Sequence, residues 1–388
     1  MTQSVPFETF DSVLSRVDTD SVKWDLYKGQ EVLPFWVADM DFAIAQPIQD
    51  AVRQRLDHPI LGYTLTPDDL PGAVTDFLNH QYQWAVDPEW LVWLPGVICG
   101  LAASCRAFVK PGEHIVVNPP IYHHFFDSHE PSQIIDRLPL RCGNDHRWTW
   151  DLSALEERLQ KGGVSLLMLC SPQNPTGTVF TKQEIQDLMT LADAYDVMVV
   201  SDEIHCDLVI NPNATHYPTA AAAPEFQNNT VTLMSGSKTW NLAGLNCSFA
   251  IIPDAKKREA YKEAVQSTVP IVPPLAFTAT LAAYQQGEPW RSSLLKYLWQ
   301  NYQHIVDKFS SEPEITVHPL DATYLAWLDA SALGVKNAKT LFEEFGVGLS
   351  DGAQFGQPGF LRLNFACPRA TLDEGLNRMI KAIESLRA

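Results

Sequence analysis

Lys238 is the residue whose surroundings in this sequence most clearly suggest covalent chemistry. It stands among small hydroxyl residues in Ser235-Gly-Ser-Lys-Thr239, and apolar runs at Val231–Met234 and Cys247–Ile252 flank that segment. Such runs predict two buried strands with the lysine in the turn between them. Lysine is rarely buried without a partner, so chemistry or an exposed loop tip must account for it. A surface turn is the alternative interpretation of this segment alone.

Two further polar clusters follow predicted strands. Ser171–Gly177, a proline-rich turn, presents Asn174, and Ser201–Cys206 presents Asp202. Because the carboxyl ends of adjacent parallel strands meet at one edge of a sheet, we expect Asn174, Asp202 and Lys238 to lie together. An amide, a carboxylate and an amine at one edge could bind a ring that bears a phenolic oxygen, a basic nitrogen and an aldehyde.

The elements that position these residues alternate between strand and helix from residue 91 onward. Short, nearly unbroken apolar runs such as His114–Val117 and Val164–Cys170 are typical of strands covered on both faces. Amphipathic helices are expected between them, most clearly at Asp151–Lys161 and at Thr181–Tyr195. The pattern predicts an α/β fold with a mostly parallel sheet flanked by helices.

The chain is expected to form a large domain and a smaller one. Residues 47–286 carry the strand and helix alternation, whereas residues 1–46 lack a regular period and are predicted to be an arm packed on another part of the protein. Residues 287–388 predict a smaller α+β domain that begins with a long helix near Trp290–Phe309. Ala220–Pro224 is expected to be a loop.

Composition excludes several classes of function. The 388 residues carry 28 Lys and Arg against 46 Asp and Glu, giving a formal net charge of -18. Such a charge repels phosphate backbones and anionic lipid, so we expect neither nucleic-acid nor membrane binding. The N-terminal residues lack the basic and apolar regions of a signal peptide, and no apolar run is long enough to span a membrane, which predicts a cytoplasmic protein.

Cysteine and histidine patterns do not indicate a metal site. The 7 cysteines are scattered without a Cys-x-x-Cys motif, which favours buried free thiols over disulfides or zinc ligands. The 11 histidines include no His-Glu-x-x-His. His123 and His124 are adjacent and are expected to lie on a strand with their rings pointing apart.

The strand-end motifs resemble those of a known family. Asn174 in S-P-Q-N-P-T-G, Asp202 in S-D-E-I-H, Lys238 in S-G-S-K-T and Arg362 in R-L-N-F resemble the pyridoxal-phosphate enzymes of fold type I, the class I and II aminotransferases. Order and spacing match over nearly the whole chain. The resemblance implies a large domain with a mostly parallel sheet, a smaller α+β domain and pyridoxal 5'-phosphate as cofactor.

One branch of this family is matched more closely. Trp36–Phe42, Asp202–His205 and Lys238–Leu245 resemble the MalY/PatB branch of cystathionine β-lyases, which are C–S lyases. Aminotransferases of this fold usually carry an arginine for the cofactor phosphate eight residues after the lysine, where this chain has Asn246. The MalY-like lyases share that departure, so it favours this branch.

The resemblance assigns roles around the cofactor ring. Lys238 is the catalytic residue, which holds the cofactor covalently and moves the substrate Cα proton. Asp202 pairs with the ring nitrogen, and Asn174 donates to the phenolic oxygen. His205 supports Asp202 or the ring oxygen, and Tyr122 stacks on the ring. For His205 and Tyr122, an ordinary structural residue is the alternative.

The resemblance also assigns the cofactor phosphate. Backbone N–H groups of Val97 and Ile98, at a helix start, and the hydroxyls of Ser235 and Ser237 are implied to bind it. Tyr63 of the partner subunit is implied to reach the same phosphate, which makes a homodimer with shared active sites part of the expectation. A plain turn is the alternative for the segment around Tyr63.

The substrate side is implied to involve Arg362, Ala38 and Tyr122. Arg362 lies on an otherwise apolar strand, where an arginine usually pairs with an anion. The resemblance gives it the substrate α-carboxylate, assisted by backbone near Ala38, whereas a structural ion pair is the alternative. Asp39 and Asp41 either line the site or hold the arm.

The function expected from the resemblance is β-elimination of cystathionine or a related S-substituted cysteine. The products are a thiol such as homocysteine, pyruvate and ammonia. Transamination with the same residues is the first alternative. A regulatory protein-binding role on the same fold is an alternative of another class.

Overall fold

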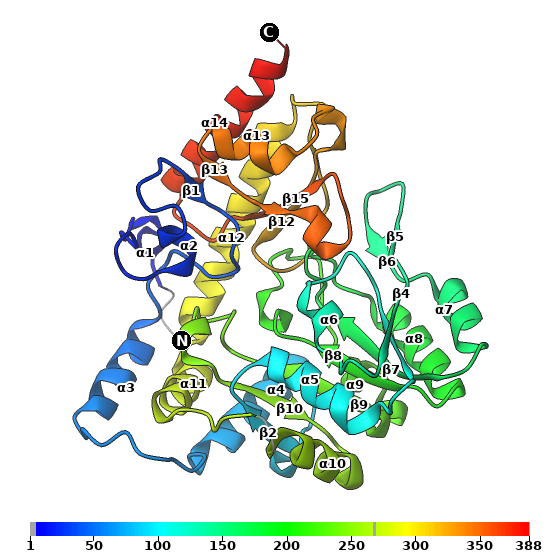
Figure 1. Ribbon diagram of the computed structural model, residues 1–388. Helices are drawn as coiled ribbons and strands as arrows, with labels where there is room; N and C mark the ends of the chain where they lie inside the picture. Colours follow the sequence, from blue (N-terminus) through cyan, green and yellow to red (C-terminus); the bar gives the residue numbers. More distant parts are fainter. Residues whose placement is uncertain (1–4, 267–268, 388) are drawn as a thin grey trace.

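The computed structural model describes residues 5–266 and 269–387 (Figure 1). Within them, the largest sheet has seven strands in the order β2-β10-β9-β8-β7-β3-β4. The strands from β9 to β4 run parallel, and β10 is antiparallel to both of its neighbours. In sheet order the strands are Leu91–Leu94, Ser248–Ile251, Thr230–Met234, Met198–Asp202, Val164–Cys170, His114–Val117 and Ile134–Arg137. The mostly parallel α/β sheet predicted from the apolar runs is confirmed.

Helices cover both faces of this sheet because its strands are apolar on both sides. Neighbouring residues such as Val199 and Val200 are fully buried and belong to separate cores on opposite faces. The covering helices are α5 (Val97–Phe108) and α10 (Ala255–Gln266) on one face, and α7 (Leu152–Leu159) and α8 (Lys182–Ala194) on the other. Thr181 and Glu184 form a capping box at the start of α8.

A second, antiparallel sheet lies in the C-terminal part of the chain, drawn in orange in Figure 1. Its order is β11-β12-β15-β14. The strands are Thr316–Val317, Leu325–Asp329, Phe360–Asn364 and Ser350–Asp351, and the helices nearby in the chain are α12 (Glu288–Phe309), α13 (Ala338–Glu344) and α14 (Arg369–Arg387).

The N-terminal arm packs against this C-terminal part (Figure 1). Its elements are α1 (Glu8–Asp11), α2 (Val22–Asp25) and β1 (Leu33–Pro34). Strand β1 pairs in parallel with β13 (Val347–Gly348). The arm therefore belongs with the end of the chain rather than with the large sheet that follows it in sequence.

The helix that ends the large part of the chain suggests where two domains meet. Helix α11 (Pro274–Gln286) packs on α3 (Gln46–Leu56) and α4 (Asp69–Tyr82), and Gly287 separates it from α12. We propose a large domain at 47–286, with 1–46 and 287–388 forming the arm and the smaller domain. No helix among the described residues is long and apolar enough to cross a membrane.

Three local expectations were wrong. The predicted loop near residue 220 contains the short helix α9 (Thr219–Ala222). His123 and His124 lie at the start of α6 (His124–Asp127), where successive side chains are about 100° apart, so their rings are near each other at 4.3 Å. Cys142 is exposed rather than buried, because it lies on the small hairpin of β5 (Arg141–Cys142) and β6 (Trp148–Thr149).

Candidate active site

The pairing of three neighbouring strands brings Asn174, Asp202 and Lys238 to one edge of the large sheet. Cys170, the last residue of β7, lies opposite Asp202 at the end of β8. Asp202 in turn lies opposite Leu233 in β9. The segments that follow these strand ends carry Asn174 and Lys238, as the strand-end motifs predicted.

The amine of Lys238 is held by the N-terminal arm. Lys238 Nζ donates a hydrogen bond of 2.6 Å to the carbonyl oxygen of Ala38. The hydroxyl of Tyr324 donates to the same oxygen at 3.0 Å. Burial, together with the positive charge of Arg362, lowers the pKa of Lys238 to about 8. A larger fraction of the amine is therefore unprotonated and nucleophilic than for an exposed lysine.

Asp202 is a buried carboxylate without an ionic partner. It is 5% exposed and accepts a hydrogen bond of 3.0 Å from the backbone N–H of Ile204. Burial raises its pKa to about 7. No cationic side chain in the described ranges lies within 4.0 Å of it. A carboxylate in this position is suited to pair with a cationic group of a bound molecule.

Replacing Asp202 by asparagine is expected to stabilise the ligand-free protein at alkaline pH. The folded pKa of Asp202 lies above the ordinary value of about 4, so the stability linked to its protonation is present below about pH 4 and is lost as the pH rises through about 7. Asparagine carries no charge and keeps an oxygen for Ile204, so the variant avoids a loss of about 4 kcal/mol.

Urea unfolding of the ligand-free proteins at about pH 5 and about pH 8 measures this effect. The free energy of unfolding of Asp202→Asn should exceed that of the wild type by more at pH 8 than at pH 5. An equal difference at both pH values would contradict the burial of an ionised Asp202.

His205 and Tyr122 lie at the same edge. His205 is 2% exposed, and its Nδ1 has no hydrogen-bond partner in the described part of the chain. Burial lowers the pKa of His205 to about 3, so its ring is neutral at pH 7. Burial raises the pKa of Tyr122. The positive charge of Arg362 acts to lower this pKa, and the negative charge of Asp202 acts to raise it. Nδ1 of His205 is thus available to hydrogen-bond a ligand group at this edge.

Arg362, on β15, brings a buried positive charge to the site. It donates to Oδ1 of Asn174 at 3.0 Å and to the carbonyl oxygen of Trp36 at 2.8 Å, while its Nε has no partner among the described residues. Burial lowers its pKa to about 10. No carboxylate of residues 5–266 or 269–387 lies within 4.0 Å, so the structural ion pair considered from the sequence is not found there. A guanidinium in this setting is suited to bind a carboxylate.

Sequence reasoning missed the residue that joins the arm to the lysine loop. Oδ1 of Asn241 accepts from the N–H of Met40, and its Nδ2 donates to the carbonyls of Met40 and Phe42, all at 3.0 Å. Asn241 lies three residues after Lys238, within the Lys238–Leu245 segment that resembles the lyase branch, and this position could have marked it as part of the site. Asn241 thus holds the segment whose Ala38 carbonyl accepts from Lys238.

Asp39 and Asp41 hold the arm through ion pairs. Arg16 lies 2.7 Å from Asp39 and 2.8 Å from Asp41. Lys23, which is fully buried, lies 2.8 Å from Asp41. Both carboxylates therefore have arm cations as partners and hold the arm, and the charge of Asp39 also acts on Lys238.

The residues assigned to the cofactor phosphate differ in how available their hydrogen-bond donors are. Val97 and Ile98 begin α5, where backbone N–H groups lack partners within the helix. The hydroxyl of Ser235 donates to the carbonyl of Cys247 at 2.6 Å and accepts from the N–H of Ser237 at 3.0 Å, so its proton is already used. Tyr63 is 99% exposed on the connection between α3 and α4.

The sequence matches the family described as aminotransferase class I and II over residues 32–379. That match covers most of the chain. The chain belongs to the aminotransferase class I and II family. The family resemblance expected from the four motifs is confirmed, and the fold is that of the pyridoxal-phosphate enzymes of fold type I.

Relatives within this family include several named as lyases. Cystathionine beta-lyase PatB of Bacillus subtilis is 37% identical, with 96% of this chain and 99% of PatB aligned. Protein MalY of Escherichia coli is 35% identical, covering 97% and 99%. The structure of cystalysin from Treponema denticola, which contains pyridoxal 5'-phosphate, superimposes with a TM-score of 0.92 at 30% identity, covering 97% and 99%. Aspartate aminotransferase of Pyrococcus horikoshii, by contrast, is 23% identical, covering 92% of each chain.

Proposed function

We propose that this protein is a pyridoxal-phosphate-dependent C–S β-lyase that cleaves cystathionine or a related S-substituted cysteine to a thiol, pyruvate and ammonia. The observation that carries the proposal is a set of charges without ionic partners, two at the edge of the large sheet and one, that of Arg362, on β15 beside Asn174. Lys238, Asp202 and Arg362 have no ionic partner in the described ranges. A cofactor with an aldehyde and a basic ring nitrogen, together with an amino-acid carboxylate, supplies a partner to each.

The residues present fit pyridoxal 5'-phosphate. Lys238 offers an amine of lowered pKa to the aldehyde, and Asp202 offers a buried carboxylate to the ring nitrogen. Asn174 uses its oxygen for Arg362, which leaves its amide N–H groups to donate to the phenolic oxygen. When bound, the cofactor withdraws the electrons left at the substrate Cα after that carbon loses its proton.

The chain's own residues would bind, orient and move protons. Arg362 binds the α-carboxylate and fixes the direction of the Cα–H bond. The Lys238 amine would take the Cα proton as a general base. The Ala38 carbonyl, which already accepts from Lys238 and Tyr324, keeps the amine near that position. Asp202 remains ionised while it pairs with the protonated ring nitrogen.

Elimination is proposed over transamination for two reasons. The relatives named as cystathionine β-lyases are more similar to this chain than the aminotransferase is. Asn246 also stands where aminotransferases place the phosphate arginine, and it is exposed. The thioether preferred as substrate depends on the pocket walls near Tyr122 and the Trp36–Phe42 segment.

Spectroscopy and product analysis test this proposal. Purified protein with added pyridoxal 5'-phosphate should gain an absorption band in the visible range. It should then release pyruvate from cystathionine without a keto-acid acceptor. A strict requirement for such an acceptor would show transamination instead, and absence of the visible band would overturn the cofactor assignment.

We also propose that two copies of the chain share their active sites. Tyr63 and its neighbours Ile60, Leu61 and Leu65 are exposed on the connection between α3 and α4. Exposed apolar residues gathered in one segment are typical of a protein–protein interface. Tyr63 of the partner subunit would then donate to the cofactor phosphate, compensating for Asn246.

A mixed dimer provides the sharpest check of this arrangement. Tyr63→Phe is expected to weaken cofactor binding by about 10- to 100-fold, the effect of one charge-assisted hydrogen bond. Subunits carrying Tyr63→Phe or Lys238→Ala should each be impaired alone. Equal amounts of the two variants are then unfolded and refolded together. In a mixed dimer, one site combines the intact Lys238 of one chain with the intact Tyr63 of the other. About a quarter of all sites should therefore contain both residues, and activity should rise accordingly. No gain on mixing would show that each site uses its own Tyr63 or none.

A further inference from the structure

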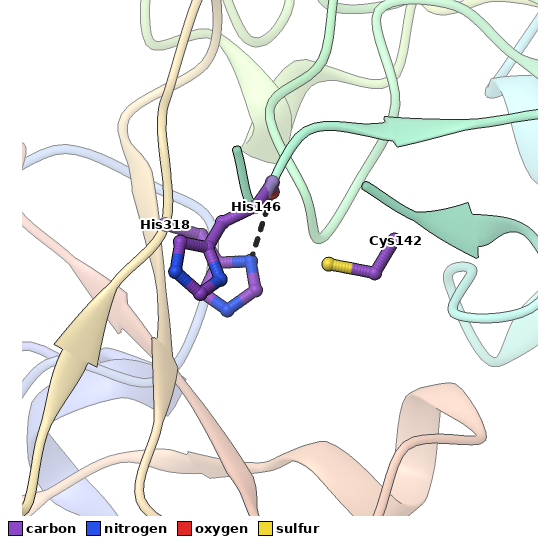
Figure 2. Close-up of side chains that lie close together, drawn as sticks. All are labelled: Cys142, His146 and His318. Carbon is purple, nitrogen blue, oxygen red and sulfur yellow. Dashed lines mark hydrogen bonds between the residues drawn. The ribbon is translucent and has the colours of Figure 1, made fainter. Parts of the chain in front are cut away.

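Three side chains with atoms that bind transition metals meet outside the proposed active site. Cys142 Sγ, one ring nitrogen of His146 and one of His318 all lie within 4.8 Å of one another (Figure 2). Cys142 and His146 belong to the β5–β6 hairpin, and His318 follows β11 in the smaller sheet. The thiol of Cys142 points toward the two imidazole rings (Figure 2).

His318 supplies the observation that favours a ligand. Its side chain is 2% exposed, and its Nε2 is a buried atom without a hydrogen-bond partner in the described part of the chain. Its Nδ1 lies 3.1 Å from the carbonyl oxygen of His146. Metal-binding histidines commonly donate one ring N–H to a backbone carbonyl and bind the metal through the other nitrogen. The Nδ1 contact of His318 matches that arrangement.

The indole of Trp148 competes for the same nitrogen. Its Nε1 lies 3.0 Å from Nδ1 of His318, and an N–H donor there requires an unprotonated Nδ1. The two contacts of Nδ1 therefore correspond to two tautomers of His318. Only the one that donates to His146 leaves a lone pair on Nε2 for a metal.

Charges around the three side chains suit a cation. The carboxylates of Asp145 and Asp329 act electrostatically on Cys142 and are negatively charged at neutral pH. A divalent cation would be attracted by both carboxylates and would favour the thiolate.

We propose that Cys142, His146 and His318 bind one Zn²⁺ ion, with a water molecule as the fourth ligand. One thiolate and two imidazoles are ligands that zinc prefers, and zinc bonds of about 2.0–2.3 Å place tetrahedral ligand atoms about 3.3–3.6 Å apart. Because Cys142 and His146 are exposed, rotation of their side chains can close the remaining gap. Binding releases the thiol proton of Cys142 to solvent.

The ion would join His146 and His318, which are 172 residues apart in the sequence. The hairpin already contacts the smaller sheet through Trp148, whose ring stacks on that of His318 at 5.9 Å. A bound zinc ion would add a bond between the proposed large domain and the smaller one. It would thus stabilise the contact between these two parts of the chain.

Zinc titration of the purified cofactor-loaded enzyme tests the proposal. One Zn²⁺ should bind per chain, and Cys142→Ser or His146→Gln should weaken its affinity by about 100-fold or more. Both side chains are exposed, so these variants should fold normally. Cys99→Ser is the matched control, because Cys99 is partly buried and remote in sequence, and its affinity should equal that of the wild type.

Thiol reactivity gives a second readout at the same atom. Cys142 is the exposed cysteine of this chain and should react first with a chromogenic disulfide reagent. Saturating Zn²⁺ should slow that reaction by at least about tenfold. Equal zinc affinity in wild type, Cys142→Ser and His146→Gln, or unchanged reactivity of Cys142 with zinc, would overturn the proposal.

Removal of the competing indole tests which nitrogen binds. Trp148→Phe leaves the His146 carbonyl as the acceptor for Nδ1–H of His318 and should keep or increase the zinc affinity. A loss of affinity as large as that of Cys142→Ser would exclude Nε2 of His318 as the ligand.

Discussion

Lys238→Ala is expected to lower the rate of pyruvate formation by at least about 10⁴-fold, because it removes both the general base and the covalent attachment of the cofactor. The amine lies 2.6 Å from the Ala38 carbonyl and has a pKa lowered to about 8, which fits a group that exchanges protons near neutral pH. Single-turnover absorbance and steady-state pyruvate release measure the loss.

Stability separates a catalytic role of Lys238 from a structural one. The variant removes a partly buried charge without a carboxylate within 4.0 Å among the described residues, so its melting temperature should not fall. Lys238→Arg is the control that retains the positive charge but lacks a nucleophilic amine, and it should be as inactive as the alanine variant. Activity above about 1% of wild type in either variant would refute the assigned role.

Arg362→Leu is expected to reduce kcat/KM for amino-acid substrates by about 10³-fold. The guanidinium is buried, has no carboxylate partner in the described ranges and keeps one unpaired N–H at Nε. Loss of two charge-assisted hydrogen bonds to a substrate carboxylate accounts for an effect of this size. Steady-state kinetics on cystathionine measure it.

A substrate analogue without the carboxylate is the control for Arg362. Cystathionine derivatives that lack the α-carboxylate should bind wild type and Arg362→Leu equally, whereas carboxylated ones should bind the variant more weakly. Cofactor absorption should be retained. If both classes of ligand lose affinity to the same degree, Arg362 acts by holding Asn174 and Trp36, which it also contacts, rather than by binding substrate.

The strand-end chemistry could be predicted from the sequence because it depends on local patterns. Apolar runs followed by polar turns are sufficient to place Asn174, Asp202 and Lys238 at one edge once the strands are parallel. Their order along the chain and the order of β7, β8 and β9 in the sheet agree, so no long-range information was needed.

Features that depend on contacts between distant segments could not be predicted in this way. The buried Lys23 has no local pattern that marks it, since its partner Asp41 becomes a neighbour only when the arm folds back. The hydroxyl of Ser235 is used by Cys247 across the turn, a contact that residue types alone do not specify. Cys142 and His146, the first two residues of the proposed zinc site, are four residues apart in the sequence. The third residue, His318, follows β11 of the smaller sheet, so no local pattern joins it to them.

The pairing of the arm with the end of the chain has a consequence for biosynthesis on the ribosome. The backbone N–H groups of Phe35 and Asp41 donate to the carbonyls of Gly348 and Ala366 at 2.7 and 2.9 Å. These acceptors are translated about 300 residues later, which takes about 15–60 s at ordinary elongation rates. The large sheet can therefore fold before the arm has its hydrogen-bond partners. Nascent chains stalled before residue 346 should contain a folded sheet but an incomplete Lys238 environment.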